Sequence, residues 1–95
     1  GRSEFAKLRG SYRVILLHLL KWDHQPQRRS RSWLSSIENH RSDAEETLAD
    51  NPCLKPRVEE ALDQAYAAAR RVAAAETGLA IEDLPQTRPY DLQAV

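Results

Sequence analysis

The chain has 95 residues, which is enough for one small hydrophobic core and too few for two. Leu, Ile, Val and Phe supply only about a fifth of the side chains, but 14 basic residues balance 14 acidic ones, which excludes the high net charge of a disordered chain. The single cysteine, Cys53, excludes an internal disulfide and a paired-cysteine zinc site, and it favours a reducing, cytoplasmic location. We therefore expect one globular domain with a thin core.

The first predicted element is a helix over about residues 3–24. Its main apolar face follows helical spacing and consists of Phe5, Leu8, Tyr12, Ile15, Leu16 and Leu19. Val14, Leu17 and Leu20 add a second apolar face, so this helix is expected in the middle of the domain. The helix should end before Pro26, because the residue before a proline is driven out of helical geometry. The apolar run at residues 14–20 is far shorter than the roughly 20 residues that a membrane span needs, so no membrane span is expected.

A polar, basic connection over residues 24–32 precedes the second predicted helix, which runs to about residue 50. Ser30 or Ser32 is expected to cap its N-terminus, because a serine hydroxyl accepts a hydrogen bond from the backbone of the first turn. The apolar stripe of this helix is narrow and consists of Trp33, Ile37, Ala44 and Leu48. Arg41 lies on the same row, so most of the helix should face water and form the outer helix of the domain.

The third predicted helix begins between residues 52 and 56, after Asn51 and Pro52 interrupt the second one. It ends near Thr77, with Gly78 as the left-handed residue that terminates it. Its many alanines make it slim, so that a neighbouring helix can approach closely. Residues 79–84 predict one further helical turn, which an irregular tail follows. The elements together predict an all-α fold, a small bundle of three main helices with a short C-terminal helical turn and an irregular tail.

The charges are distributed unevenly along the chain. Residues 1–41 contain nine basic and three acidic side chains, a net charge of +6, whereas residues 42–95 contain five basic and eleven acidic ones, a net charge of −6. If the two halves fold against each other, these charges partly neutralise. If they face apart, the molecule is a dipole that can steer a charged partner or stack head to tail.

Residues 18–33 carry a more specific pattern. It consists of His18, Leu19, Leu20, Lys21, Trp22, Gln25, Pro26, Arg28, Ser32 and Trp33. At this spacing the segment resembles the bacterial family known as domain of unknown function 29. Similar elements recur at the start of the third helix and at residues 76–78 and 89–90. The resemblance covers essentially the whole chain, and it implies an all-helical, cytoplasmic protein without an established activity.

The resemblance also implies a boundary for the domain. Members of that family typically begin earlier, with an acidic helical part, so residues 1–95 are expected to be a single helical domain that forms the C-terminal two-thirds of a longer one. On this interpretation the apolar face of Val14, Leu17 and Leu20 is exposed here. It would pack on the missing part, on a second copy or on a crystal neighbour.

The basic segment at residues 21–33, with its two tryptophans, is the most distinctive candidate for a binding site. Together with one arginine of the second helix, the candidates for an interaction or anion contact are Lys21, Trp22, Gln25, Arg28, Arg29, Arg31, Ser32, Trp33 and Arg41. In a nucleic-acid interface the arginines would contact phosphates and a tryptophan would stack on a base. In a structural interpretation the tryptophans close the core and the arginines pair with acids of the other half. The neutral overall charge weighs against a dedicated DNA-binding domain.

No residue pattern indicates an enzyme, a metal site or a cofactor. His18, His24 and His40 lack the spacing of metal ligands. No base lies near Cys53 in the sequence, although a helix N-terminus at that point would make its thiol more reactive. The leading hypothesis is a bacterial cytoplasmic interaction module, an adaptor or regulator that associates through its helices with a protein partner or a second copy. The alternative is nucleic-acid binding through residues 21–33.

Overall fold

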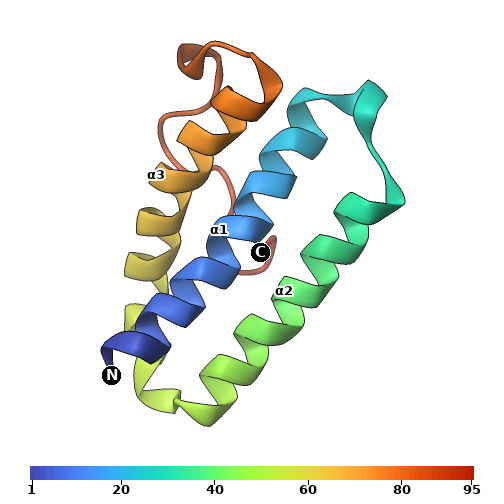
Figure 1. The fold of residues 1–95 in the computed structure, drawn as a ribbon. Helices are drawn as coiled ribbons and strands as arrows, with labels where there is room; N and C mark the ends of the chain where they lie inside the picture. The colour runs from blue at the N-terminus through green and yellow to red at the C-terminus, as the bar shows by residue number, and fades with distance from the viewer.

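The computed structural model describes residues 1–95 and consists of helices and connecting turns, without strands (Figure 1). The three long helices are α1 (Arg2–His24), α2 (Arg31–Asp50) and α3 (Val58–Thr77). The short 3-10 helices are η1 (Pro26–Arg28), η2 (Pro52–Arg57) and η3 (Ile81–Asp83). α1 lies between α2 and α3 and packs along both of them. The predicted all-α bundle with the first helix at its centre is confirmed.

The apolar residues of α1 decide how this helix is oriented. Its buried residues are Phe5, Leu8, Ser11, Tyr12, Ile15, Leu16 and Leu20. Leu20 is only 1% exposed, so the expectation of an exposed apolar face is wrong for this residue. Leu20 lies one turn after Leu16 and continues the same buried row, because residues four apart face the same side of a helix. Val14 and Leu17 are partly exposed.

α2 begins where the sequence predicts it and contributes least to the core. The Ser30 hydroxyl accepts a hydrogen bond from the Trp33 backbone N–H at 3.4 Å, so Ser30 and not Ser32 is the N-cap. Only Ile37, Ala44 and Thr47 of this helix are buried. α2 is therefore the outer helix, as predicted.

α3 begins later than predicted and ends where expected. Pro52 and Pro56 lie within η2, so the chain passes through a 3-10 helix before the α-helix starts at Val58. A proline has no backbone N–H to donate to a helix, which delays regular α-helical bonding. Gly78 ends α3 with a φ of 78°, the left-handed conformation that glycine adopts without strain. The alanines of α3 that face the core are Ala61, Ala65, Ala69 and Ala73.

The C-terminal tail folds back along the bundle, and its end lies beside the middle of α1 (Figure 1). The predicted helical turn is η3, and polar side chains of α3 hold the backbone that follows it. The Tyr66 hydroxyl donates to the Pro85 carbonyl, and the Arg70 guanidinium donates to the Leu84 carbonyl at 3.1 Å. Leu84 and Val95 are buried. The tail therefore covers one side of the bundle with a few apolar anchors and several hydrogen bonds.

Candidate functional site

The predicted site at residues 21–33 forms one end of the bundle, where α1 turns through η1 into α2. Its two tryptophans lie in different hollows of the surface. Lys21 and Trp22 are neighbours on α1, but successive helical residues point about 100° apart. The Lys21 ammonium lies 5.2 Å from the ring centre of Trp33, whereas the Arg29 guanidinium lies 4.9 Å from that of Trp22. The structure thus divides the predicted site into two separate surfaces.

The first surface is a polar hollow of 360 Å³ between the ends of α1 and α3. Its lining residues are Lys21, Gln25, Arg28, Trp33, Glu76 and Thr77. Lys21 Nζ lies 2.8 Å from Glu76 Oε1, so this lysine is paired with an acid of the C-terminal half, as the structural interpretation expects. The pairing leaves Arg28 as the only cation of the hollow without a carboxylate partner.

The second surface is an apolar groove of 290 Å³, which we call the α1/α2 groove. It is lined by Leu19, Trp22, Leu34, Ile37, Glu38 and Arg41. Leu34 is 50% exposed, more than the other large apolar side chain that stands out at the surface, Leu92 at 47%. Arg29 borders the groove, because its Nε donates to the Trp22 carbonyl at 2.9 Å. A partner could therefore bury apolar side chains here without displacing any part of the chain.

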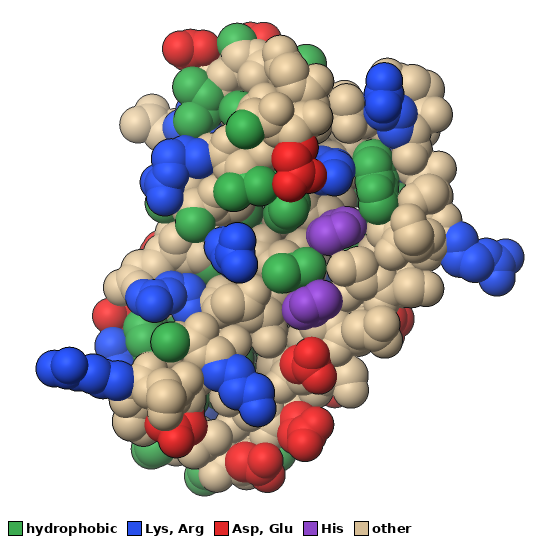
Figure 2. Space-filling model, in the orientation of Figure 1, with side chains coloured by type: hydrophobic (Ala, Val, Ile, Leu, Met, Phe, Trp, Pro, Cys, Tyr) green, Lys and Arg blue, Asp and Glu red, His purple; other side chains and the backbone are tan.

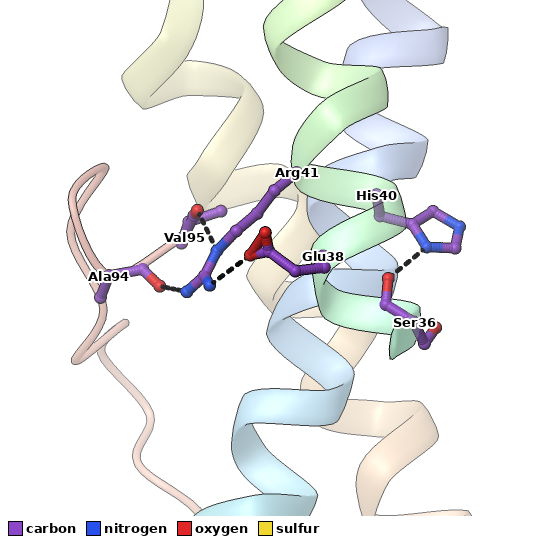
Figure 3. A network of polar contacts seen from close by, with 6 residues as sticks. All are labelled: Ser36, Glu38, His40, Arg41, Ala94 and Val95. Carbon is purple, nitrogen blue, oxygen red and sulfur yellow. Dashed lines mark hydrogen bonds and ion pairs between the residues drawn. The ribbon is translucent and has the colours of Figure 1, made fainter. Parts of the chain in front are cut away.

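Arg41 joins the α1/α2 groove to the C-terminal tail (Figure 3). Its Nε donates to the Val95 carbonyl at 3.0 Å, and one terminal nitrogen donates to the Ala94 carbonyl at 2.6 Å. The other terminal nitrogen donates to Glu38 Oε1 at 3.2 Å. Arg41 thus makes hydrogen bonds within the protein that hold the tail against α2. Among the predicted interaction residues, it therefore has a structural role.

The remaining predicted residues lie at the surface. Ser32 Oγ lies 3.0 Å from Ser30 Oγ in the first turn of α2. Arg28 and Arg31 are exposed, and neither has a carboxylate within 4.0 Å. These two arginines are therefore free to contact an anionic group of a partner.

A third hollow, the α1/α3 groove, lies outside the predicted set. It measures 410 Å³ and is lined by Ala6, Arg9, Gly10, Arg13, Gln64, Ala65 and Ala68. The Arg9 guanidinium donates to Gln64 Oε1 at 2.8 Å, and Arg13 is exposed. A Cβ added at Gly10 would meet nothing within 4 Å, so this part of α1 faces open space. Small side chains form the floor of the groove and arginines form its wall.

The groups with chemical reactivity do not converge. His18 Nδ1 lies 2.8 Å from the Val14 carbonyl, and His40 Nδ1 lies 2.8 Å from the Ser36 carbonyl (Figure 3), so both rings bond to their own helices. No three His, Cys, Asp or Glu side chains lie together in a way that could hold a metal ion. Cys53 is exposed in η2 and not at the start of the α-helix, which begins at Val58.

Leu34 is the main residue of the α1/α2 groove that sequence reasoning missed. The signal for it was present, because Trp33 and Leu34 are adjacent large apolar residues on one helix. Successive helical residues point about 100° apart, so the narrow apolar stripe of α2 that contains Trp33 leaves Leu34 beside it. The α1/α3 groove had no such signal, since its arginines and alanines come from two helices far apart in the sequence.

The comparisons with known proteins assign the family. The family described as "Domain of unknown function DUF29" matches residues 1–95. The chain belongs to the DUF29 family. Because the match spans residues 1–95, the expectation that the N-terminal part of the family domain is missing is not borne out. No curated protein and no solved structure matches this DUF29 chain. None of its helices has both the length and the apolar character that crossing a membrane requires.

Proposed function

We propose that this DUF29 domain is an interaction module, a cytoplasmic adaptor or regulator that binds a partner protein in its α1/α2 groove. The observation that carries the proposal is the apolar lining of this groove. Leu34 is half exposed, and the ring of Trp22 and the side chain of Leu19 are only partly covered. At a protein interface, leucine and tryptophan side chains in such a hollow provide the buried anchor that supplies most of the binding energy.

The charges at the edge of the groove indicate the chemistry of the partner. Arg29 bonds to the Trp22 carbonyl at the edge of the groove, and Arg31 lies three residues before Leu34, on the same side of α2. Neither arginine has a carboxylate within 4.0 Å. Glu38 is the acid of the lining, and Arg41 already neutralises it. The groove thus favours an acidic amphipathic helix that presents apolar side chains one turn apart, the mode in which a helix docks in a groove.

Nucleic-acid binding through residues 21–33 remains the second proposal. Exposed Arg28 and Arg31 support it, since both are free to contact phosphates. The division of the two tryptophans between separate hollows supports it less, because one strand of nucleic acid would have to stack on both sides of the hairpin.

Peptides displayed on phage test the first proposal on the 95-residue chain. We expect selection on the immobilised protein to enrich peptides with apolar residues at positions i, i+3 or i+4 and a net negative charge. The Leu34→Glu variant should weaken their binding at least about 10-fold, which corresponds to about 1.4 kcal/mol. Leu92→Glu is the matched control, because Leu92 is almost equally exposed and lies outside the groove lining, so its peptide affinity should stay within about twofold.

Two results would contradict the groove as the binding site. One is a peptide affinity that Leu34→Glu and Leu92→Glu change equally, and the other is a selection that enriches no acidic amphipathic peptide. In parallel, a fluorescent single-stranded DNA oligonucleotide tests the second proposal. Salt-sensitive binding that the Arg28→Glu and Arg31→Glu changes abolish would support it, and an affinity unchanged by them would end it.

A further inference from the structure

The side of α1 that faces away from the C-terminal tail is only partly covered by the neighbouring helices. Tyr12 of α1 shares a hollow with Val95 of the tail. Gly10 lies two residues away and therefore points to nearly the opposite side of the helix. On that opposite side Ala6 is exposed, and Gly10, Val14 and Leu17 are partly exposed. This surface, which we call the open face, comprises the exposed sides of α1, α2 and α3 opposite the tail (Figure 2).

The α1 and α3 part of the open face is basic. Arg9 and Arg13 form the wall of the α1/α3 groove, and neither has a carboxylate within 4.0 Å. Arg71 lies three residues after Ala68, so it follows the same side of α3, and it too is unpaired and exposed. Figure 2 shows Lys and Arg side chains spread over this part of the face.

The α2 part of the same face is acidic. Asp43, Glu46 and Asp50 are exposed and have no cation within 4.0 Å. They follow spacings of three and four residues and so form one row. Figure 2 shows Asp and Glu side chains grouped over the lower part of α2. The face therefore carries opposite charges on its two sides.

The acidic row of α2 and the basic α1/α3 groove lie at the same level along the bundle. Glu46 and Asp50 share a hollow with Lys7 of α1, which is about half a turn from Arg9. Consider two copies of the chain related by a twofold axis that lies in the plane of the open face and runs parallel to α1. Each residue then keeps its level along the bundle, and the acidic side of one copy faces the basic side of the other. This arrangement brings the acidic row of each copy over the basic groove of the other, so that the same complementary contact forms twice.

We propose that two copies of the chain associate face to face through the open face, with the acidic row of α2 seated on the α1/α3 groove of the partner. The small side chains of Ala6, Gly10 and Ala68 allow α2 of the second copy to approach closely. The broad side of the molecule extends over 38 × 27 Å, which accommodates the roughly 800 Å² per partner of a standard interface. The neutral net charge places no overall repulsion on the pair.

Sedimentation velocity on the 95-residue protein tests the dimer. We expect the dimer to form at about 100 µM protein in low salt and to dissociate at about 0.5 M NaCl, because exposed charges are screened over a few ångströms there. A wild-type protein that stays monomeric at about 500 µM in low salt would overturn the proposal.

Charge-reversal variants test the pairing of the acidic row with the basic α1/α3 groove. The Arg9→Glu/Arg13→Glu variant and the Asp43→Arg/Glu46→Arg variant should each be monomeric, with the dimer dissociation constant raised at least about 10-fold. Mixed in equal amounts, the two variants should form one-to-one dimers, because each mixed contact again joins opposite charges. The Arg29→Glu/Arg31→Glu variant is the matched control, since it makes the same charge change at two exposed arginines on the side of the α1/α2 groove, outside the open face.

The outcome of the mixing experiment supports or overturns the proposed dimer. Mixed dimers together with a dimeric control variant support the arrangement. Variants that stay dimeric on their own, or a mixture that stays monomeric, would overturn it. Circular dichroism spectra of the variants should match that of the wild type, which checks that each variant is folded. The α1/α2 groove lies on other residues, so peptide binding and dimer formation can fail independently of each other.

Discussion

Replacing Tyr12 by phenylalanine is expected to stabilise the protein, whereas replacing Tyr66 by phenylalanine is expected to destabilise it. Both changes remove one hydroxyl group. The Tyr12 side chain is 1% exposed, and its hydroxyl is buried without a hydrogen-bond partner. Burial raises the pKa of Tyr12, and the negative charge of Glu59 raises it further. The Tyr66 hydroxyl, in contrast, donates to the Pro85 carbonyl and so helps to hold the tail.

The expected magnitudes follow from these surroundings. A buried polar group without a partner costs about 1–3 kcal/mol, so Tyr12→Phe should raise the free energy of unfolding by about 1 kcal/mol. Tyr66→Phe should lower it by about 1 kcal/mol, because a hydrogen bond is lost and the Pro85 carbonyl is left unpaired. In a domain of this size each change corresponds to about 4–8 °C in Tm, upward for Tyr12→Phe and downward for Tyr66→Phe.

Urea unfolding followed by far-UV circular dichroism measures both variants beside the wild type. The slope of the unfolding free energy against urea should stay the same, since neither variant changes the surface exposed on unfolding. A Tyr12→Phe variant less stable than the wild type by more than about 0.5 kcal/mol would refute the reasoning, because it would show that the Tyr12 hydroxyl has a partner in the fold.

Three further predictions concern the core, a helix end and pH. Leu16→Ala should cost about 2–5 kcal/mol in urea unfolding because Leu16 is 0% exposed, whereas Leu34→Ala in the α1/α2 groove should cost less than about 0.5 kcal/mol. Gly78→Ala should cost about 1 kcal/mol in the same assay, because alanine is strained at a φ of 78°. Burial and a hydrogen bond to Asp23 raise the pKa of Tyr90, so above about pH 10 the folded state keeps a proton that the unfolded state releases. The free energy of unfolding should therefore fall as pH rises in this range. Tyr90→Phe should reduce that alkaline loss relative to the wild type in unfolding curves recorded at neutral and alkaline pH.

The ends of the helices were predictable because local rules govern them. The Ser30 cap and the left-handed Gly78 depend on the hydrogen bonds and φ angles of single residues, and both lie where the sequence places them. The start of α3 was less predictable, because Pro52 and Pro56 are both compatible with a first helical turn. There the chain forms a 3-10 helix before the α-helix begins.

The candidate site was predictable in its residues but not in its arrangement. Sequence reasoning selected both tryptophans and the arginines around them, yet Trp22 and Trp33 line different hollows. It could not foresee that Lys21 pairs with Glu76, a residue 55 positions further along the chain. Such pairs depend on which helix faces which, and periodicity within one helix does not contain that information.

The sequence by itself determined the all-helical class, the three long helices and the central position of α1, because spacing, caps and helix-breaking residues act over a few positions. The tertiary structure alone decided which apolar side chains stay exposed. Leu20 belongs to the buried core, whereas Leu34 is left half exposed in the α1/α2 groove. It also decided the place of the tail, which Arg41 holds against α2. These contacts join residues more than 50 positions apart, so they exist only once the helices have packed.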